Sequence, residues 1–262
     1  MMERPKKSLG QNFLSNKEIL SKIVSYGDIT ENDIVLEIGP GTGNLTNELL
    51  KKNPKQLIVV EKDNELAKMI KNNFGNRVSV INKDILKVFK NFRFDEPIKV
   101  FGNLPYNIST KILISFIKLD DLNAMCNKFV FIFQKEVAER IVAKQNTKDY
   151  GRLSILTSWK MHSKKIFDIS PINFYPKPKV WSSLIALTPK TKIEKFKKSN
   201  TLEHVTNIFF NQRRKMIRKP MKQLFSNYEY IASKLELDMN LRPQNLSINK
   251  YLEICKIFEK LS

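Results

Sequence analysis

IVLEIGPGTG, residues 34–43, is the stretch that decides the fold, because a run of apolar residues leads directly into a glycine-rich turn. Apolar residues at helical spacing follow over residues 44–52. We therefore expect a buried strand, a tight turn and a helix in that order. Glycine permits the turn and lets a ligand approach the backbone closely.

Strand and helix signals continue to alternate after this stretch. Short apolar runs indicate further strands, at residues 56–60, 78–81, 98–101 and 129–133. Apolar residues three and four positions apart indicate crossover helices, at residues 64–73, 110–118 and 134–144. Two later runs, around residues 164–168 and 180–188, are typical of a final strand pair. The pattern predicts an α/β, Rossmann-like domain with a mostly parallel sheet of seven strands.

A change in composition divides the chain. Residues 188–201 (TPKTKIEKFKKSNT) are polar and lysine-rich, as is typical of a linker. The residues after this stretch keep helical periodicity and carry no strand signal. We expect a main domain over residues 1–188, a linker over residues 189–201 and a small all-helical domain over residues 202–262.

The chain carries 46 lysines and arginines against 26 aspartates and glutamates, a formal net charge of +20. Such a surplus attracts polyanions and favours a nucleic acid partner, with drift in a lysine-rich composition as the alternative. Cys126 and Cys255 form no CxxC pair, so we expect neither a disulfide framework nor a metal site. The basic, polar N-terminus and the lack of any long apolar run favour a cytoplasmic protein with no membrane segment.

Acidic residues follow the two strands expected after the glycine turn. Glu61 ends one strand, where a carboxylate can accept hydrogen bonds from both hydroxyls of a ribose. Asp84 follows the next, where it can accept a hydrogen bond from an adenine amino group while Ile85 packs on the ring. These features favour an adenosine ligand. The alternative is that the glycine turn only packs a strand against a helix and that the aspartate only meets solvent. A nicotinamide dinucleotide fits less well, because its GxGxxG pattern needs glycine where Asn44 stands.

The segment FGNLPYN, residues 101–107, follows the fourth expected strand and indicates the chemistry. Asn-x-Pro-Tyr resembles the signature of amino methyltransferases, whose donor, S-adenosylmethionine, carries an activated methyl group. If the Asn103 side-chain oxygen and a carbonyl near Leu104 accept the two protons of an adenine amine, its lone pair is aimed at that methyl group. Pro105 then fixes the loop, and Tyr106 stacks on an extruded base. A plain turn with a buried tyrosine is the alternative.

Four segments resemble one family, the KsgA-type small-subunit rRNA adenine dimethyltransferases. They are GQNFL at residues 10–14, EIGPGTG at 37–43, NLPY at 103–106 and FYPKPKV at 174–180. The resemblance covers nearly the whole chain and implies a class I methyltransferase domain that dimethylates N6 of two adjacent adenines in the 3′-terminal hairpin loop of 16S rRNA. It further implies action on the immature small subunit, a role in ribosome biogenesis, a monomeric chain and S-adenosylhomocysteine as product.

The resemblance also assigns roles to single residues. Phe174 and Tyr106 would sandwich the adenine, and the catalytic loop would be Asn103, Leu104, Pro105 and Tyr106. The residues that would bind S-adenosylmethionine are Gln11, Asn12, Leu14, Gly39, Gly41, Glu61, Asp84, Ile85 and Asn103. Macrolide-resistance 23S rRNA methyltransferases share several of these motifs, but four segments look like the small-subunit enzyme: residues 39–43, 134–140, 150–154 and 212–219. A mainly non-catalytic small-subunit assembly factor is a further alternative.

A basic run, QRRKMIRK at residues 212–219, is the expected RNA contact. Its candidate residues are Arg213, Arg214, Lys215 and Arg218. At one- and four-residue spacing, Arg213, Arg214 and Arg218 would share one face of a helix and grip phosphates. A charged face that only meets solvent is the alternative.

Overall fold

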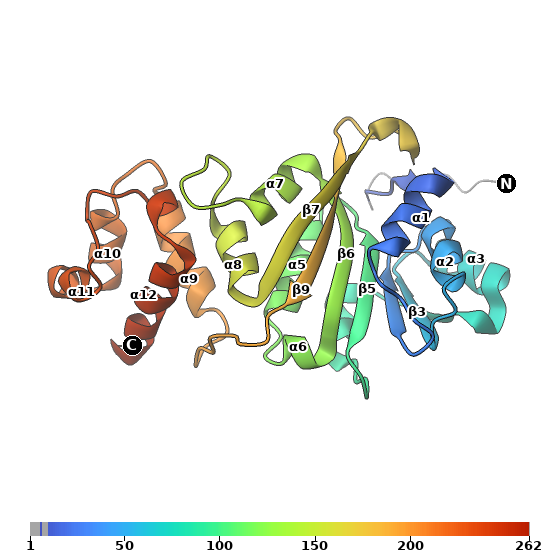
Figure 1. Cartoon of the computed structure of the whole chain (residues 1–262), viewed down its shortest axis with the longest axis horizontal. Coiled ribbons are helices and arrows are strands. Elements are labelled where there is room, and N and C mark those ends of the chain that lie inside the picture. The colour runs from blue at the N-terminus through green and yellow to red at the C-terminus, as the bar shows by residue number, and fades with distance from the viewer. Residues whose placement is uncertain (1–5, 7–9, 262) are drawn as a thin grey trace. The chain divides into compact units, whose positions relative to one another are not determined.

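The computed structural model describes residue 6 and residues 10–261. The chain forms two compact units. The first contains residues 1–138 and 163–189, and the second contains residues 139–162 and 190–262. Both can be followed by colour in Figure 1.

A seven-stranded sheet forms the centre of the first unit, with the strand order β4-β3-β2-β5-β6-β9-β7. The strands are β2 (Ile34–Ile38), β3 (Gln56–Glu61), β4 (Ser79–Asn82), β5 (Ile98–Asn103), β6 (Cys126–Gln134), β7 (Met161–Ile169) and β9 (Ser182–Pro189). Strands β2 to β6 are parallel, whereas β9 is antiparallel to β6. The predicted mostly parallel, Rossmann-like sheet is confirmed, and each strand bound lies within three residues of the expected one.

The strand order reverses beside β2. The chain leaves β2 for β3 and β4 on one side and then returns to form β5 on the other side. Loops leave the carboxyl ends of β2 and β5 in divergent directions at such a reversal, and this opens a crevice where parallel α/β sheets bind ligands. The glycine turn follows β2, and the Asn103 loop follows β5.

Helices cover both faces of the sheet, as Figure 1 shows. They are α1 (Lys17–Ser25), α2 (Asn44–Leu50), α3 (Asn64–Phe74), α4 (Ile85–Val88), α5 (Ser109–Ile117) and α6 (Leu122–Met125). Helix α7 (Lys135–Val142) contains the boundary between the two units. Successive side chains of β6 point to opposite faces of the sheet, so this strand contributes to the packing on both. Val130 and Ile132 join a core cluster with residues of α1 and α2, whereas Phe129 packs on Phe116 of α5 with ring centroids 5.1 Å apart.

Two short strands outside the main sheet bring distant segments together. Strand β1 (Phe13–Leu14) pairs antiparallel with β8 (Phe174–Tyr175), so that Leu14 lies opposite Phe174. Next to them, Asn16 begins α1 by accepting hydrogen bonds from the backbone N–H groups of Glu18 and Ile19, at 3.0 and 3.1 Å. A segment near the N-terminus is thereby fixed beside the sheet edge that carries the glycine turn.

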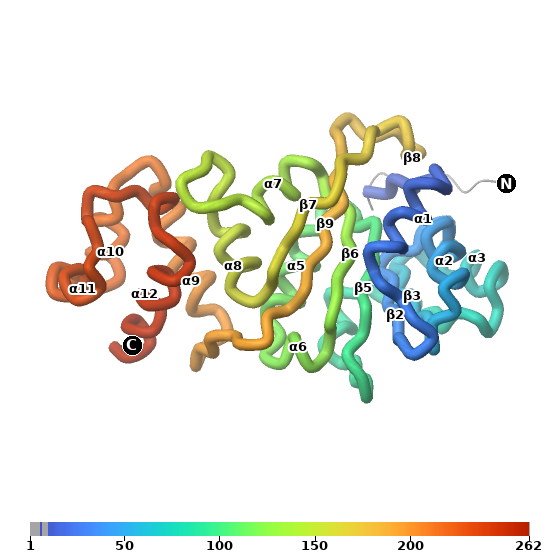
Figure 2. Tube along the Cα trace, viewed as in Figure 1, coloured from blue at the N-terminus to red at the C-terminus, as the bar shows by residue number. Residues whose placement is uncertain are grey.

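The second unit is helical, as Figure 2 traces. Its helices are α8 (Arg152–Lys160), α9 (Thr201–Phe210), α10 (Arg218–Leu224), α11 (Tyr228–Lys234) and α12 (Ile248–Leu261). Helix α8 contacts both α9 and α12. The expected linker also packs here, because the Trp159 ring lies tilted against Phe196 with ring centroids 5.4 Å apart and donates a hydrogen bond to the Glu194 carbonyl at 2.8 Å. The first unit ends at Pro189, next to the boundary expected at residue 188. Residues 139–162 and 190–201, which were expected in the main domain and in a linker, group with the C-terminal helices.

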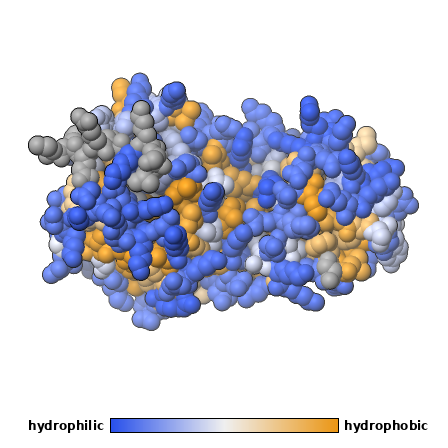
Figure 3. Space-filling model, turned by 180° about the vertical axis from the view of Figure 1, so that it is seen from behind, coloured by the Kyte–Doolittle hydropathy of each residue, from blue (hydrophilic) through white to orange (hydrophobic). Residues whose placement is uncertain are grey.

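Hydrophilic side chains cover most of the face drawn in Figure 3, with hydrophobic patches between them. Among the described residues, no helix combines the length and the apolar character that crossing a membrane requires.

Candidate active site

A pocket lies where the strand order reverses. Residues of the N-terminal segment 10–14, of the glycine turn 39–42 and of the loop 103–108 line it, together with Glu61 and Lys62 after β3. Most predicted site residues meet here, namely Gln11, Asn12, Leu14, Gly39, Gly41, Glu61, Asn103, Leu104, Pro105 and Tyr106. They come together because the carboxyl ends of parallel strands lie at the same edge of the sheet.

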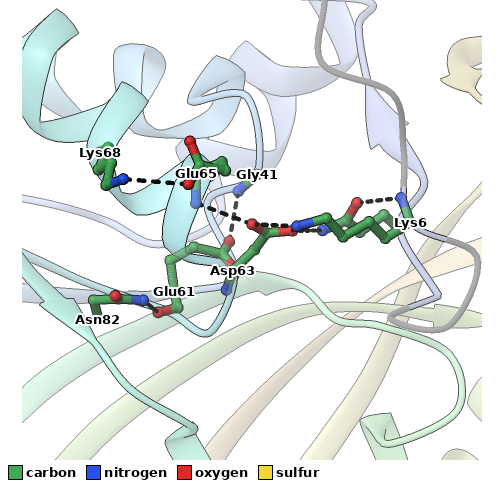
Figure 4. Close-up of polar contacts among 8 residues, drawn as sticks. Lys6, Gly41, Glu61, Asp63, Glu65, Lys68 and Asn82 are labelled. Atoms are coloured by element: carbon green, nitrogen blue, oxygen red, sulfur yellow. Dashed lines mark hydrogen bonds and ion pairs between the residues drawn. The ribbon is translucent and has the colours of Figure 1, made fainter.

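Glu61 is a fixed, buried carboxylate on the wall of this pocket, with 7% of its surface exposed. One carboxylate oxygen accepts the N–H of Gly41 at 3.3 Å, and the other accepts the N–H of Asp63 at 2.8 Å (Figure 4). Asn82 holds the same residue from β4 by donating to the Glu61 carbonyl at 2.9 Å. Burial raises the Glu61 pKa, although its backbone hydrogen bonds oppose the shift.

Asp63 fastens the N-terminal segment to the loop after β3. Its carboxylate contacts the Lys6 ammonium at 2.8 Å and accepts a hydrogen bond from Gln11 Nε2 at 3.3 Å (Figure 4). Burial raises the pKa of Asp63, but these hydrogen bonds and that of Glu65 N–H outweigh it and leave the pKa lowered. Asp63 had no predicted role, and the available signal was its position as an N-cap residue directly before α3.

A hydrogen bond to the N-terminal segment orients the Asn103 side chain. Its Nδ2 donates to the Asn12 carbonyl at 2.6 Å, a bond that orients the amide and does not use the acceptor oxygen Oδ1. Leu104 is buried, whereas Tyr106 is partly exposed and its hydroxyl lies 2.5 Å from Ser182 Oγ. Burial raises the pKa of Tyr106, so its phenol remains neutral at pH 7. The loop thus presents an oriented amide beside an aromatic ring.

Glu37 is a second buried carboxylate of the pocket and had no predicted role. It is 1% exposed, lines the pocket and accepts a hydrogen bond from Thr46 Oγ1 at 2.6 Å. Burial raises its pKa to about 8, and the nearby Glu61 adds to the shift while Thr46 opposes it. A glutamate within the apolar strand IVLEI was the available signal, because an acidic side chain in a buried strand needs a partner.

Three of the predicted catalytic and cofactor-binding residues do not line the pocket. Asp84 contacts the Lys62 ammonium at 3.1 Å and caps α4 by accepting the Leu86 N–H at 3.0 Å. Burial raises the pKa of Asp84, but Lys62 and the cap outweigh it and lower the pKa. Ile85 is 5% exposed, and Phe174 is 4% exposed in the core cluster opposite Leu14. Their ligand roles stay predictions.

The expected single helical face of the basic run is wrong. Helix α9 ends at Phe210, residues 211–215 form turns, and α10 begins only at Arg218. The break has two physical causes: Pro220 is tolerated only in the first turn of a helix, and the Ile217 N–H bonds to the Leu241 carbonyl at 2.8 Å. Arg213 donates to the Lys148 carbonyl, whereas Arg214, Lys215 and Arg218 are exposed. These residues lie on a turn and a helix start, not on one helical stripe.

The mostly parallel sheet with a pocket at its reversal is the arrangement of Rossmann-like methyltransferases, and solved structures share it. A dimethyladenosine transferase from Plasmodium falciparum superposes with a TM-score of 0.75 and 27% identity, covering 95% of this chain and 98% of that one. The 23S rRNA methyltransferase ErmE superposes with a TM-score of 0.69 and 21% identity over 95% of this chain and 99% of its own, a likeness of fold alone. Fold and pocket thus define a methyltransferase class.

Sequence comparison gives the family within this class. The family model for ribosomal RNA adenine dimethylases matches residues 2–260. A protein of Pelagibacter ubique named ribosomal RNA small subunit methyltransferase A is 52% identical over 261 residues, which cover 100% of this chain and 99% of that protein. A protein of the same name from the Wolbachia of Drosophila simulans is 42% identical, over 95% and 91% of the two chains. The chain belongs to the ribosomal RNA adenine dimethylase family, and it is an enzyme.

Proposed function

We propose that this protein transfers methyl groups from S-adenosylmethionine to N6 of two adjacent adenines in the 3′-terminal hairpin loop of 16S rRNA, within the immature small subunit. The observation that carries the proposal is the Asn103 amide, which is oriented at the pocket by its 2.6 Å bond to the Asn12 carbonyl. The small-subunit rRNA specificity rests on the relatives, which are named for that substrate.

The pocket residues fit S-adenosylmethionine as the donor. When bound, this cofactor supplies an activated methyl group on a positively charged sulfonium. Glu61 can accept hydrogen bonds from both ribose hydroxyls, since its carboxylate is already fixed against the Gly41 and Asp63 N–H groups. The second acidic side chain, Glu37, lies in the same pocket wall, and a cationic ligand there favours its ionised form and lowers its raised pKa. Gly41, at φ +56, keeps the turn free of a side chain.

Adenine N6 is a weak nucleophile because its lone pair is delocalised into the ring. Asn103 Oδ1 accepts one N6 proton, and the Leu104 carbonyl accepts the other, so that the lone pair turns out of the ring plane toward the methyl group. This positioning and the preorganised acceptors account for the rate without a covalent enzyme intermediate. Pro105 favours an extended Leu104, which keeps that carbonyl in place.

The target base must leave its stack to reach the pocket. Tyr106 offers one ring, held by its hydroxyl contact with Ser182, and Phe174 offers the other. Since Phe174 is 4% exposed against Leu14, its use in stacking requires the β1–β8 region to rearrange when RNA binds. The exposed Arg214, Lys215 and Arg218 bind RNA phosphates in this proposal.

A methyl-transfer assay with three RNA substrates tests the proposal. Labelled S-adenosylmethionine is supplied with immature small subunits, with naked 16S rRNA or with large-subunit rRNA, and the modified bases are mapped. We expect dimethyladenine in the 3′-terminal loop of the small-subunit rRNA. Absence of dimethyladenine from all three substrates contradicts the enzyme proposal, and modification of large-subunit rRNA alone contradicts the choice of substrate.

The Asn103→Ala variant tests the assigned mechanism in the same assay. We expect loss of methyl transfer with RNA binding largely retained, because the amide positions the amine and does not hold the RNA backbone. Equal loss of transfer and of RNA binding would contradict the role given to Asn103.

A further inference from the structure

Exposed aromatic and apolar side chains gather in one stretch of the first unit, which we call the proline segment (residues 171–181, PINFYPKPKVW). Its exposed members are Ile172 (76%), Tyr175 (59%), Val180 (43%) and Trp181 (49%). Lys177 and Lys179 are also exposed, and the segment contains no acidic residue. Clustered apolar exposure bordered by one sign of charge marks a binding surface.

The proline segment is anchored at both ends. The Asn173 carbonyl accepts the Ser15 N–H at 3.0 Å, and the Asn173 side chain accepts a hydrogen bond from Asn16 at 3.0 Å. At the other end, the Trp181 carbonyl accepts the Lys135 N–H at 2.9 Å. Prolines at positions 171, 176 and 178 further restrict the backbone. These bonds hold the two ends of the segment, so that any rearrangement of β8 on RNA binding is confined between Asn173 and Trp181.

Trp181 is joined in sequence to a residue that contacts the pocket. The following residue, Ser182, has its hydroxyl 2.5 Å from that of Tyr106, which lines the pocket. Consecutive Cα atoms are about 3.8 Å apart, so the Trp181 backbone lies beside the contact between Ser182 and Tyr106. Its exposed indole can reach a nucleotide strand that delivers a base to Tyr106.

We propose that Trp181 and Tyr175 stack on nucleotides that flank the target adenine, while Lys177 and Lys179 pair with phosphates of the same strand. The inference rests on the proposed function and adds the residues that position the RNA around the extruded base. Extrusion removes a stacking partner from each neighbour, and aromatic rings can replace it without sequence preference. The positive charge of the segment favours an RNA strand over an apolar protein partner.

Tryptophan fluorescence tests the stacking directly. The chain has two tryptophans, and Trp159 is 5% exposed in the second unit, so quenching by RNA reports mainly on Trp181. The probe is an RNA hairpin with two adjacent adenines in its loop, and a fully paired RNA of equal length is the control. We expect quenching by the hairpin, weaker quenching by the duplex, and none in Trp181→Phe. Equal quenching of the wild type and Trp181→Phe overturns the proposal.

Methylation kinetics supply an independent readout. Trp181→Ala should raise KM for the hairpin about tenfold, the loss of roughly one stacked base, with kcat and S-adenosylmethionine affinity near wild type. Trp181→Phe should restore most of the loss because it keeps a ring, and Ile172→Ala, on the same segment, is the matched control. Equal KM values for Trp181→Ala and Ile172→Ala overturn the proposal. If the wild-type protein methylates no adenine, the proposed function is contradicted. The fluorescence titration still tests whether Trp181 stacks on RNA.

Discussion

Substitution of Gly41 by alanine tests how the glycine turn shapes the cofactor pocket. Gly41 has a φ of +56, which costs an alanine about 1–2 kcal/mol. The new Cβ would lie 2.7 Å from both Cδ1 and Cε1 of Phe13, so the ring must retreat by roughly 0.7 Å to reach ordinary contact at 3.4 Å. Phe13 lines the pocket, and the Gly41 N–H bonds to Glu61, so both walls of the pocket shift together.

We expect Gly41→Ala to bind S-adenosylmethionine at least about tenfold more weakly, which corresponds to about 1.4 kcal/mol. Isothermal titration with S-adenosylmethionine measures the affinity, and urea unfolding measures the stability. Gly75→Ala is the matched control, because Gly75 has a φ of +57 and no atom within 4 Å of its would-be Cβ. It should lose stability to backbone strain while keeping the affinity.

A double variant separates strain from contact. Adding Phe13→Leu to Gly41→Ala removes the ring atoms that meet the Cβ, so the two substitutions should be non-additive and part of the affinity should return. If Gly41→Ala binds the cofactor as well as Gly75→Ala does, the turn does not shape the pocket and the reasoning is refuted.

Three further predictions concern charge. Glu61→Gln should weaken S-adenosylmethionine binding by roughly ten- to hundredfold in titration calorimetry, since hydrogen bonds to a charged acceptor are lost, whereas the exposed Glu65→Gln should not. The raised Glu37 pKa, about 8 against 4.5, means that the native state binds more protons than the unfolded state between these values. Unfolding free energy should therefore fall as pH rises through that range, and urea unfolding of Glu37→Gln should show a flatter profile. Arg214→Ala combined with Lys215→Ala should reduce the salt dependence of RNA binding, by about 0.7–0.9 in the log–log slope per lost phosphate contact, and an unchanged slope would count against an RNA contact there.

Local sequence patterns were sufficient for the sheet and for most of the pocket. The run IVLEI followed by three glycines predicts strand, turn and helix because those residues act through local backbone preferences and burial. Parallel strands then bring Gly41, Glu61 and Asn103 to one edge whatever the details of packing. The N-terminal residues Asn12 and Leu14 came from family resemblance, since nothing local indicates a pairing with a segment 160 residues further along the chain.

Contacts between distant residues decided the rest. The basic run has the spacing of a helix, but Pro220 and the bond from Ile217 to Leu241 break it into a turn and a new helix. Asp84 has the sequence position of an adenine ligand, and this role stays a prediction. Only the structure shows that its carboxylate also contacts Lys62 and caps α4. Competition among partners for one side chain depends on three-dimensional placement, which spacing along the chain does not contain.

The sequence by itself therefore determined the class of fold and the strands of its main sheet, and it predicted the loop at residues 103–106 as the place of methyl transfer. Tertiary structure alone decided that Glu37 is a buried acid, that Phe174 packs against the core, and that residues 139–162 group with the C-terminal helices. The physical reason is the sequence distance over which each effect acts. Backbone preferences and hydrophobic periodicity act over a few residues, whereas burial and side-chain pairing arise only when distant segments meet.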